Sequence, residues 1–240
     1  MALVTTPTAI DADSYATVSE ADDYLAAKAK FSTWDAYTDT EKERFLKAAT
    51  RQVDLLRFGS VPMVYTNMYY RQEQKLKFPL LTENHFFTNA TSATSTTVTS
   101  NNLIDLQYMP DDIWNDGVVI ITDGTGRGQT RRISDFVSAT GVITVDTAFD
   151  ITPDASSQLL LVEDYDDEVV WGTIEQAFFL ALRRDDTLRS RVEGLKSRRI
   201  DDVSESYSIP KTIGYNGVIY SQECLGYLMR YIDNTGTIQT

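Results

Sequence analysis

The stretch GVVIITDGTGRGQTRRISDFVSATGVITV, residues 117–145, decides much of what this chain can fold into. It holds runs rich in β-branched and aromatic residues at 117–122, 131–137 and 141–145, with turns rich in Gly and Asp between them. A further run, QLLLV, follows at 158–162. Because branched side chains pack well on a pleated surface and short turns join neighbouring strands, these runs predict a small antiparallel β module.

The composition of residues 82–163 sets this module apart from the rest of the chain. The segment has no lysine, and its three arginines stand against eleven acidic residues, which gives −8 of the chain's net charge of −13. Within it, residues 88–102 are almost all Ser, Thr, Asn and Ala, a composition that favours a loop or an edge strand over a core strand. The change on both sides predicts that 82–163 is a β module inserted into another domain.

Residues 1–81 and 164–240 show helical periodicity. Apolar residues recur there at intervals of three and four, as at Ala49, Val53 and Leu56. We therefore expect an α+β protein with a mainly α-helical core of about four helices, built from the discontinuous segments 1–81 and 164–240, and an inserted antiparallel β module at 82–163. The expected helix starts are marked by Ser19, by the capping-box pair Thr38 and Glu41, by Asp164 and by Ser221.

The charge and composition exclude several classes of protein. The formal charge is −13 and the pI about 4.5, whereas a protein that gains affinity by neutralising phosphates needs clustered Lys and Arg. We therefore expect no tight binding to a DNA duplex. No apolar run approaches the ~18 residues of a membrane span, and residues 1–15 lack the pattern of a secretory signal. The single cysteine, Cys224, fits assembly in a reducing cytoplasm.

No motif predicts catalysis or a metal site, so we expect no enzyme activity, no cofactor, no catalytic residue and no metal ligand. The run GTGRG at 124–128 lacks the lysine of a phosphate-binding loop and leads into a strand, which favours a hairpin turn. His85 is the only histidine, and no spacing suggests the partners that a zinc ion or a catalytic base needs. The acids at 111–112 and 164–168 are explained by a turn and a helix start, with calcium as the alternative.

The main concentration of positive charge lies between residues 183 and 199. Its members include Arg183, Arg184, Arg198 and Arg199. One interpretation is the end of a helix followed by a solvated loop. The other is a docking surface for an acidic neighbour, or a segment that touches DNA, and the sequence favours neither.

A succession of short motifs runs through residues 14–81: Ser14-Tyr15, Thr17–Leu25, Trp34–Ala36, Thr38–Glu43, Ala48–Arg51 and Gln74–Pro79. This succession resembles that of tailed-bacteriophage head–tail adaptor (connector) proteins, a family also labelled DnaT-like. The long helix expected after 164, the extended segment at 203–207 and the closing helix follow in the family's order, up to residue 232. Phe78 stands where the family has Trp, and the hairpin at 124–133 resembles an element of other phage virion proteins.

The resemblance implies a structural virion protein at the neck, where head and tail meet, assembled in the host cytoplasm. Copies of the chain would form a ring, a dodecamer in the family, beneath the portal protein. The ring would extend the channel, let genomic double-stranded DNA pass without tight binding, and present a platform to the next tail or neck protein. No membrane is implied.

The resemblance and the residue types together suggest the contact surfaces. The expected contacts with the portal or a neighbouring subunit are Arg183, Arg184, Arg198, Arg199, Tyr231, Ile232 and Ile238, and the candidate ring contacts are Tyr65, Tyr69 and Tyr70. Two alternatives remain. One is a single-stranded-DNA-binding (DnaT-like) replication protein, which requires a positive groove with aromatic platforms. The other is a different neck, tail-completion or baseplate component.

Overall fold

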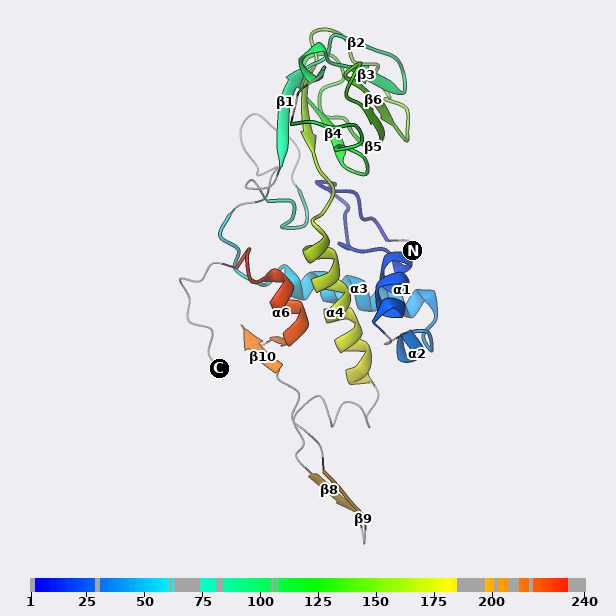
Figure 1. The fold of residues 1–240 in the computed structure, drawn as a ribbon, viewed down its shortest axis with the longest axis vertical. Helices are drawn as coiled ribbons and strands as arrows, with labels where there is room; N and C mark the ends of the chain where they lie inside the picture. The colour runs from blue at the N-terminus through cyan, green and yellow to red at the C-terminus, as the bar shows by residue number, and fades with distance from the viewer. Residues whose placement is uncertain are drawn as a thin grey trace. The chain divides into compact units, whose positions relative to one another are not determined.

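The computed structural model describes residues 3–28, 31–60, 62, 74–80, 84–104, 106, 108–184, 197–200, 203–206, 212–215 and 218–232, with backbone alone for most of the strands after 196. The chain divides into two compact units (Figure 1). The helical unit comprises Met1–Thr5, Asp13–Gly59 and Asp166–Thr240. The sheet unit comprises Thr6–Ala12 and Ser60–Tyr165.

The sheet unit is built on a seven-stranded antiparallel sheet with the order β1-β7-β4-β5-β6-β3-β2. Glycine stands in two of its turns, where Gly124, Gly126, Gly128 and Gly141 take the positive φ angles that favour glycine. The strands are β1 His85–Asn89, β2 Ser92–Ala93, β3 Thr97–Thr99, β4 Val118–Asp123, β5 Thr130–Val137, β6 Val142–Val145 and β7 Gln158–Val162, with a short 3-10 helix at Asn101–Leu103.

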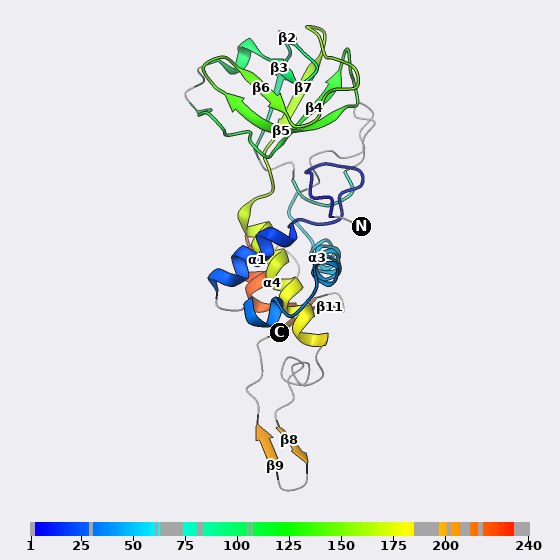
Figure 2. The same cartoon turned by 90° about the vertical axis from the view of Figure 1, so that its right-hand side faces the viewer.

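The sheet closes into a small barrel, because its two end strands, β1 and β2, follow one another in the chain while β1 pairs with β7 and β2 pairs with β3. The residues that link β1 to β2 form one backbone hydrogen bond to each end of the sheet. The Ala90 N–H donates to the Ser157 carbonyl oxygen at 2.9 Å, and the Thr91 N–H donates to the Thr99 carbonyl oxygen at 2.7 Å. Residues 85–93 therefore act as one bent strand that joins both ends of the sheet, and Figure 2 shows the curvature of strands β4 to β7. Closure leaves few unpaired strand edges.

The barrel core follows the two-residue period of its strands. On β4 and β7, the paired residues Val119 with Leu161 and Ile121 with Leu159 face inward and are fully buried. Their inward neighbours from the other strands and loops are Val98, Leu103, Met109, Trp114, Ile133, Phe136, Ile143, Val145 and Phe149. The alternate residues Val118, Ile120, Leu160 and Val162 form a second buried cluster on the opposite face.

The prediction of a mainly α-helical protein is wrong, because this antiparallel sheet is the dominant element of the structure. Within 88–102, where a loop or an edge strand was expected, residues 88–89, 92–93 and 97–99 lie in strands, and β1 and β2 are the two end strands of the sheet, so the predicted edge strand is confirmed. Two of the hydroxyl groups in this segment are satisfied inside the fold, because Thr88 Oγ1 and Ser100 Oγ are 2.7 Å apart and buried. Threonine favours these strands, because its branched side chain suits a strand although it is polar.

The helical unit contains α1 Val18–Ala27, α2 Phe31–Trp34, α3 Asp39–Val53, α4 Asp167–Arg184 and α6 Gln222–Leu228. The caps at Thr38 and Ser221 are as predicted. The cap of α1 is Thr17 rather than the expected Ser19: the Glu20 N–H donates to Thr17 Oγ1, and the Thr17 N–H donates to the Glu20 carboxylate.

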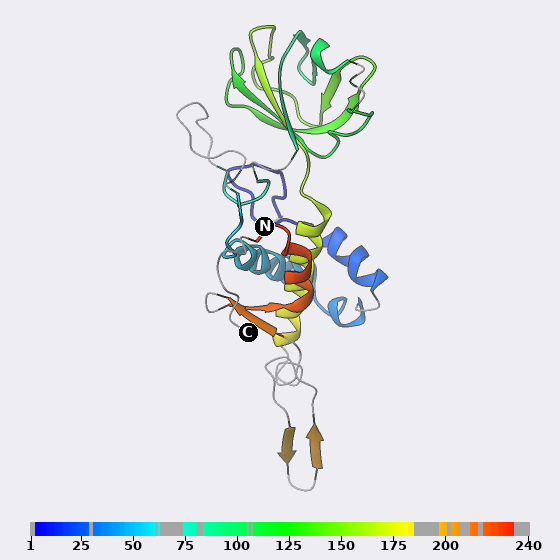
Figure 3. The ribbon, with the colours of Figure 1, turned by 60° about the vertical axis from the view of Figure 1, so that its left-hand side comes forward.

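The long helix α4 is the centre of this unit. It packs against α1, α3 and α6, and α6 lies along it in Figures 1 and 3. The shared apolar core consists of Ala16, Ala21, Leu25, Trp34, Leu46, Ala49, Ile174, Ala177, Phe178 and Ala181. A bridge between Phe58 and Ile232 ties the end of the described chain to the segment after α3.

Among the described residues, no helix combines the length and apolar character that a membrane crossing requires.

Two small sheets complete the described part of the helical unit. Strands β8 Ser197–Ile200 and β9 Val203–Ser206 form one antiparallel pair, and β10 Thr212–Tyr215 and β11 Val218–Ser221 form the other. The extended segment predicted at 203–207 is thus confirmed over 203–206, and residue 207 lies outside the described part.

Candidate functional site

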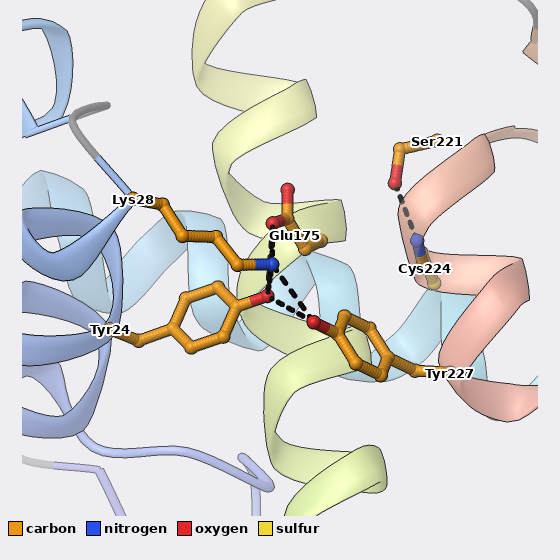
Figure 4. Close-up of polar contacts among 6 residues, drawn as sticks. All are labelled: Tyr24, Lys28, Glu175, Ser221, Cys224 and Tyr227. Carbon is orange, nitrogen blue, oxygen red and sulfur yellow. Dashed lines mark hydrogen bonds and ion pairs between the residues drawn. The ribbon is translucent and has the colours of Figure 1, made fainter.

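Side chains from three helices of the helical unit meet in one polar cluster (Figure 4). Tyr24 lies on α1, and Lys28 is the residue that caps the end of that helix, so the two side chains lie one turn apart on the same face. Glu175 comes from the middle of α4 and Tyr227 from α6. We refer to Tyr24, Lys28, Glu175 and Tyr227 as the tyrosine–lysine cluster.

The Lys28 ammonium is the centre of the tyrosine–lysine cluster. It donates to Tyr227 Oη at 2.8 Å, to Glu175 Oε1 at 3.2 Å and to Tyr24 Oη. These three contacts use all three of its protons. Tyr24 Oη also lies 3.0 Å from both Glu175 Oε1 and Tyr227 Oη, so its single proton has two possible acceptors. The four groups are therefore one connected network.

Burial and charge set the protonation of the network. The Glu175 side chain is only 2% exposed, whereas that of Lys28 is 35% exposed, so the ion pair is open to solvent on one side. Burial raises the pKa of Tyr24, which stays a neutral phenol. The hydrogen bond from Lys28 lowers the pKa of Tyr227. Burial alone would lower the pKa of Lys28, but its hydrogen bonds to Tyr227 and Glu175 outweigh that effect and raise it.

Aromatic rings surround this network. Trp171, one turn before Glu175 on α4, stacks on Tyr24 with ring centroids 6.1 Å apart and an interplanar angle of 22°. It meets Tyr227 edge-on at 5.6 Å and 65°. The Lys28 ammonium lies 4.4 Å from the centroid of the Tyr24 ring and 5.1 Å from that of Tyr227. Trp171, Tyr24 and Tyr227 are all partly exposed.

This arrangement can do two things chemically. It holds α1, α4 and α6 together through a buried carboxylate that has lost its water and gained an ammonium and a phenol instead. Its partly exposed rings and its solvent-facing ammonium also offer a stacking surface and a cation to a planar, anionic ligand.

Among the residues that the structure describes, no group of three or more His, Cys, Asp or Glu side chains is placed to hold a metal ion.

The arginines predicted as contacts occupy different elements. Arg183 is half-buried near the end of α4, with its guanidinium 5.7 Å from the centroid of the Phe179 ring. Arg184 is the last residue of α4. Arg198 and Arg199 lie in β8, opposite Glu205 and Ser204 of β9 in backbone register. Their roles as portal or subunit contacts remain predictions.

The predicted contacts at the end of the chain are partly described. Tyr231 Oη donates to Asp166 Oδ2 at 2.5 Å, and the same carboxylate oxygen accepts from Arg230 at 2.7 Å. The Tyr231 carbonyl oxygen accepts from the Gly59 N–H, and Ile232 bridges to Phe58. The remaining predicted contacts, Ile238, Tyr65, Tyr69 and Tyr70, lie outside the described residues.

The other motifs considered in the sequence have structural explanations. The GTGRG run at 124–128 joins β4 to β5, so the hairpin interpretation is confirmed. Gln129 fixes this turn, because its side-chain amide donates to the Ile151 carbonyl oxygen at 2.8 Å and accepts from the Ile151 N–H at 3.1 Å. His85 begins β1 and meets the Phe87 ring edge-on at 5.7 Å.

Comparison with known proteins adds one finding. Residues 1–100 match a family model described as "Putative DnaT-like ssDNA binding protein". The match covers less than half of the chain and includes Tyr24 and Lys28, but not Trp171, Glu175 or Tyr227. It supports the DnaT-like part of the resemblance and does not bear on a head–tail adaptor. No curated protein and no solved structure matches the chain.

Proposed function

We propose that this protein binds single-stranded DNA through the tyrosine–lysine cluster and the Trp171 ring beside it. One structural observation carries the proposal: three partly exposed aromatic rings and one ammonium group, from α1, α4 and α6, gather at a single point. The family match over residues 1–100 supports it, because Tyr24 and Lys28 lie in the matched segment.

The chemistry of a single strand fits this surface. Unpaired bases expose flat faces, and each base that stacks on an aromatic side chain contributes about 1–3 kcal/mol whatever its identity. The rings would provide the stacking surface, and the solvent-facing side of Lys28 would approach a phosphate. Glu175 neutralises most of the lysine's charge, so stacking should contribute more than phosphate neutralisation at this cluster.

Fluorescence anisotropy with a labelled oligothymidylate of roughly 20 nucleotides tests the proposal. Trp171→Leu removes a ring while leaving the Lys28–Glu175 pair intact, and we expect it to weaken binding by about 5- to 100-fold. The matched control is Tyr108→Leu, which removes an aromatic ring that is 65% exposed in the sheet unit, and it should bind like the wild type. Circular dichroism of both variants establishes that they fold.

The result that overturns the proposal is equally direct. If the wild-type protein shows no binding of the oligonucleotide at moderate salt, or if Trp171→Leu and Tyr108→Leu weaken it equally, the cluster is not a DNA-binding site. The hydrogen bonds of Lys28 would then serve only to hold the helices together.

A head–tail adaptor of the virion neck is the second candidate function, and two observations favour it. The net charge of −13 suits a wall that double-stranded DNA passes without binding. The β8–β9 pair joins none of the other described strands, and an isolated two-stranded sheet is only marginally stable in water until it gains a partner. Negative-stain images of the protein alone and with portal protein test this candidate, which requires a ring that docks on the portal.

A further inference from the structure

The sequence of α3 places three cations along one side of the helix. Arg44, Lys47 and Arg51 are separated by three and four residues, so they lie on successive turns of the same face. At a rise of ~1.5 Å per residue, Arg44 and Arg51 are about 10 Å apart along the axis. We call these three residues the α3 basic stripe.

The opposite side of α3 fixes this orientation. Leu46, Ala49 and Val53 are fully buried, the first two in the core shared with α4. Figure 2 shows α3 at the edge of the helical unit, beside α4. Because the apolar side of the helix packs in the core, the α3 basic stripe faces solvent. Arg44 and Arg51 are both exposed.

The two arginines of the stripe keep their hydrogen-bond donors available. Neither guanidinium forms an ion pair or a hydrogen bond with any residue in the described part of the chain, whereas the Lys47 ammonium pairs with Asp13 at 2.7 Å. The acids one turn beyond each end of the stripe have other partners. Glu41 accepts hydrogen bonds from the cap of the helix, and Asp54 accepts one from a tyrosine hydroxyl.

We infer that the α3 basic stripe contacts the phosphates of single-stranded DNA, with Arg44 and Arg51 each neutralising one phosphate. The inference rests on the proposed function and adds to it the electrostatic part of binding, which the charge-compensated cluster lacks. An arginine presents a planar fork of donors that matches a phosphate. A flexible strand can place successive phosphates along a rigid row of such groups, and the chain keeps this row although acids outnumber bases by 35 to 22.

The salt dependence of binding measures this contribution directly. For single strands, the slope of log K against log salt changes by about 0.7 for each phosphate that a cation neutralises. We therefore expect Arg44→Gln and Arg51→Gln each to reduce the slope by about 0.7, and the double variant by about 1.4. The probe is the same labelled oligothymidylate, titrated at several potassium chloride concentrations.

The matched control is Arg127→Gln, which removes an exposed arginine from the β4–β5 turn of the sheet unit. It should leave the slope unchanged. If the wild type binds but Arg44→Gln and Arg51→Gln keep its slope, the inference fails while single-stranded DNA binding stands. If those variants keep the slope and instead reduce self-association in sedimentation velocity, α3 contacts an acidic protein surface and the inference is again overturned. If the wild type binds no DNA, both proposals fall together.

Discussion

Replacing Lys28 by Met tests how much the tyrosine–lysine cluster stabilises the helical unit. The substitution keeps the length and most of the apolar surface of the side chain but removes its charge. It leaves the Glu175 carboxylate, which is 2% exposed, with the hydroxyl of Tyr24 as its remaining partner in the cluster. The main consequence is a buried carboxylate that has lost its ammonium partner.

The magnitude follows from the ion pair and the hydrogen bonds that the Lys28 ammonium forms. Breaking a fully buried ion pair costs about 3–5 kcal/mol, and hydrogen bonds to charged groups contribute about 1.5–3 kcal/mol. Because the Lys28 side chain is 35% exposed, water compensates part of this loss. We expect Lys28→Met to lower the free energy of unfolding by about 2 kcal/mol, which shifts the urea midpoint by roughly 1 M. Glu175→Gln in the same protein should recover about 1 kcal/mol, because it removes the buried charge.

Urea denaturation followed by tryptophan fluorescence gives the measurement. In a Trp114→Phe background, the remaining tryptophans, Trp34 and Trp171, both belong to the helical unit and report on it alone. Arg44→Met is the control, since it removes an exposed cation that has no partner among the described residues. A loss below about 0.5 kcal/mol for Lys28→Met, no larger than that of the control, would refute the argument that the buried carboxylate depends on this lysine.

Three further outcomes are expected. Gly124→Ala should destabilise the sheet unit by more than about 2 kcal/mol in thermal unfolding, because φ is +77° there and a Cβ would lie 2.1 Å from the Ser156 carbonyl oxygen. Gly226→Ala, in α6 with open space around it, should stabilise the helical unit by about 0.5–1 kcal/mol in the same assay; a decrease would contradict the helix-propensity argument. Burial raises the pKa of the Cys224 thiol, which ionises near pH 9 in the unfolded chain, so above pH 9 the folded state holds more protons and stability falls as pH rises. Urea midpoints at several pH values should show a shallower fall for Cys224→Ala, and equal slopes would count against this thiol.

Local patterns predicted the elements whose determinants are local. The β runs between 117 and 162 became β4, β5, β6 and β7, because alternating branched residues and Gly turns specify strands within a few positions. The caps at Thr38 and Ser221 were readable for the same reason. The cap at Thr17 was readable too, since the spacing of Thr17 and Glu20 is that of a capping box, and Ser19 was the wrong choice between two neighbouring hydroxyl residues.

Features that depend on distant residues could not be predicted in this way. Closure of the barrel requires the link between β1 and β2 to reach Ser157 and Thr99, and no local pattern encodes those contacts. The candidate site shows the same division. Tyr24 and Lys28 are one helical turn apart and could have been paired from the sequence, whereas Glu175 lies 151 residues after Tyr24. The spacing of the α3 basic stripe is visible in the sequence. The arginines from 183 onward are denser, however, and the basic surface was therefore predicted in that segment.

The pairing of His85 with Val162 has a consequence for how such a chain can change over time. These residues begin the first strand and end the last strand of the barrel, and they sit opposite each other in one ladder, with Cα atoms about 5 Å apart. A barrel whose two chain connections leave it side by side can be removed, or exchanged for another, by joining two nearby points with a short loop. Evolution could thus gain or lose the barrel without altering the order of the helices on either side of it in the chain.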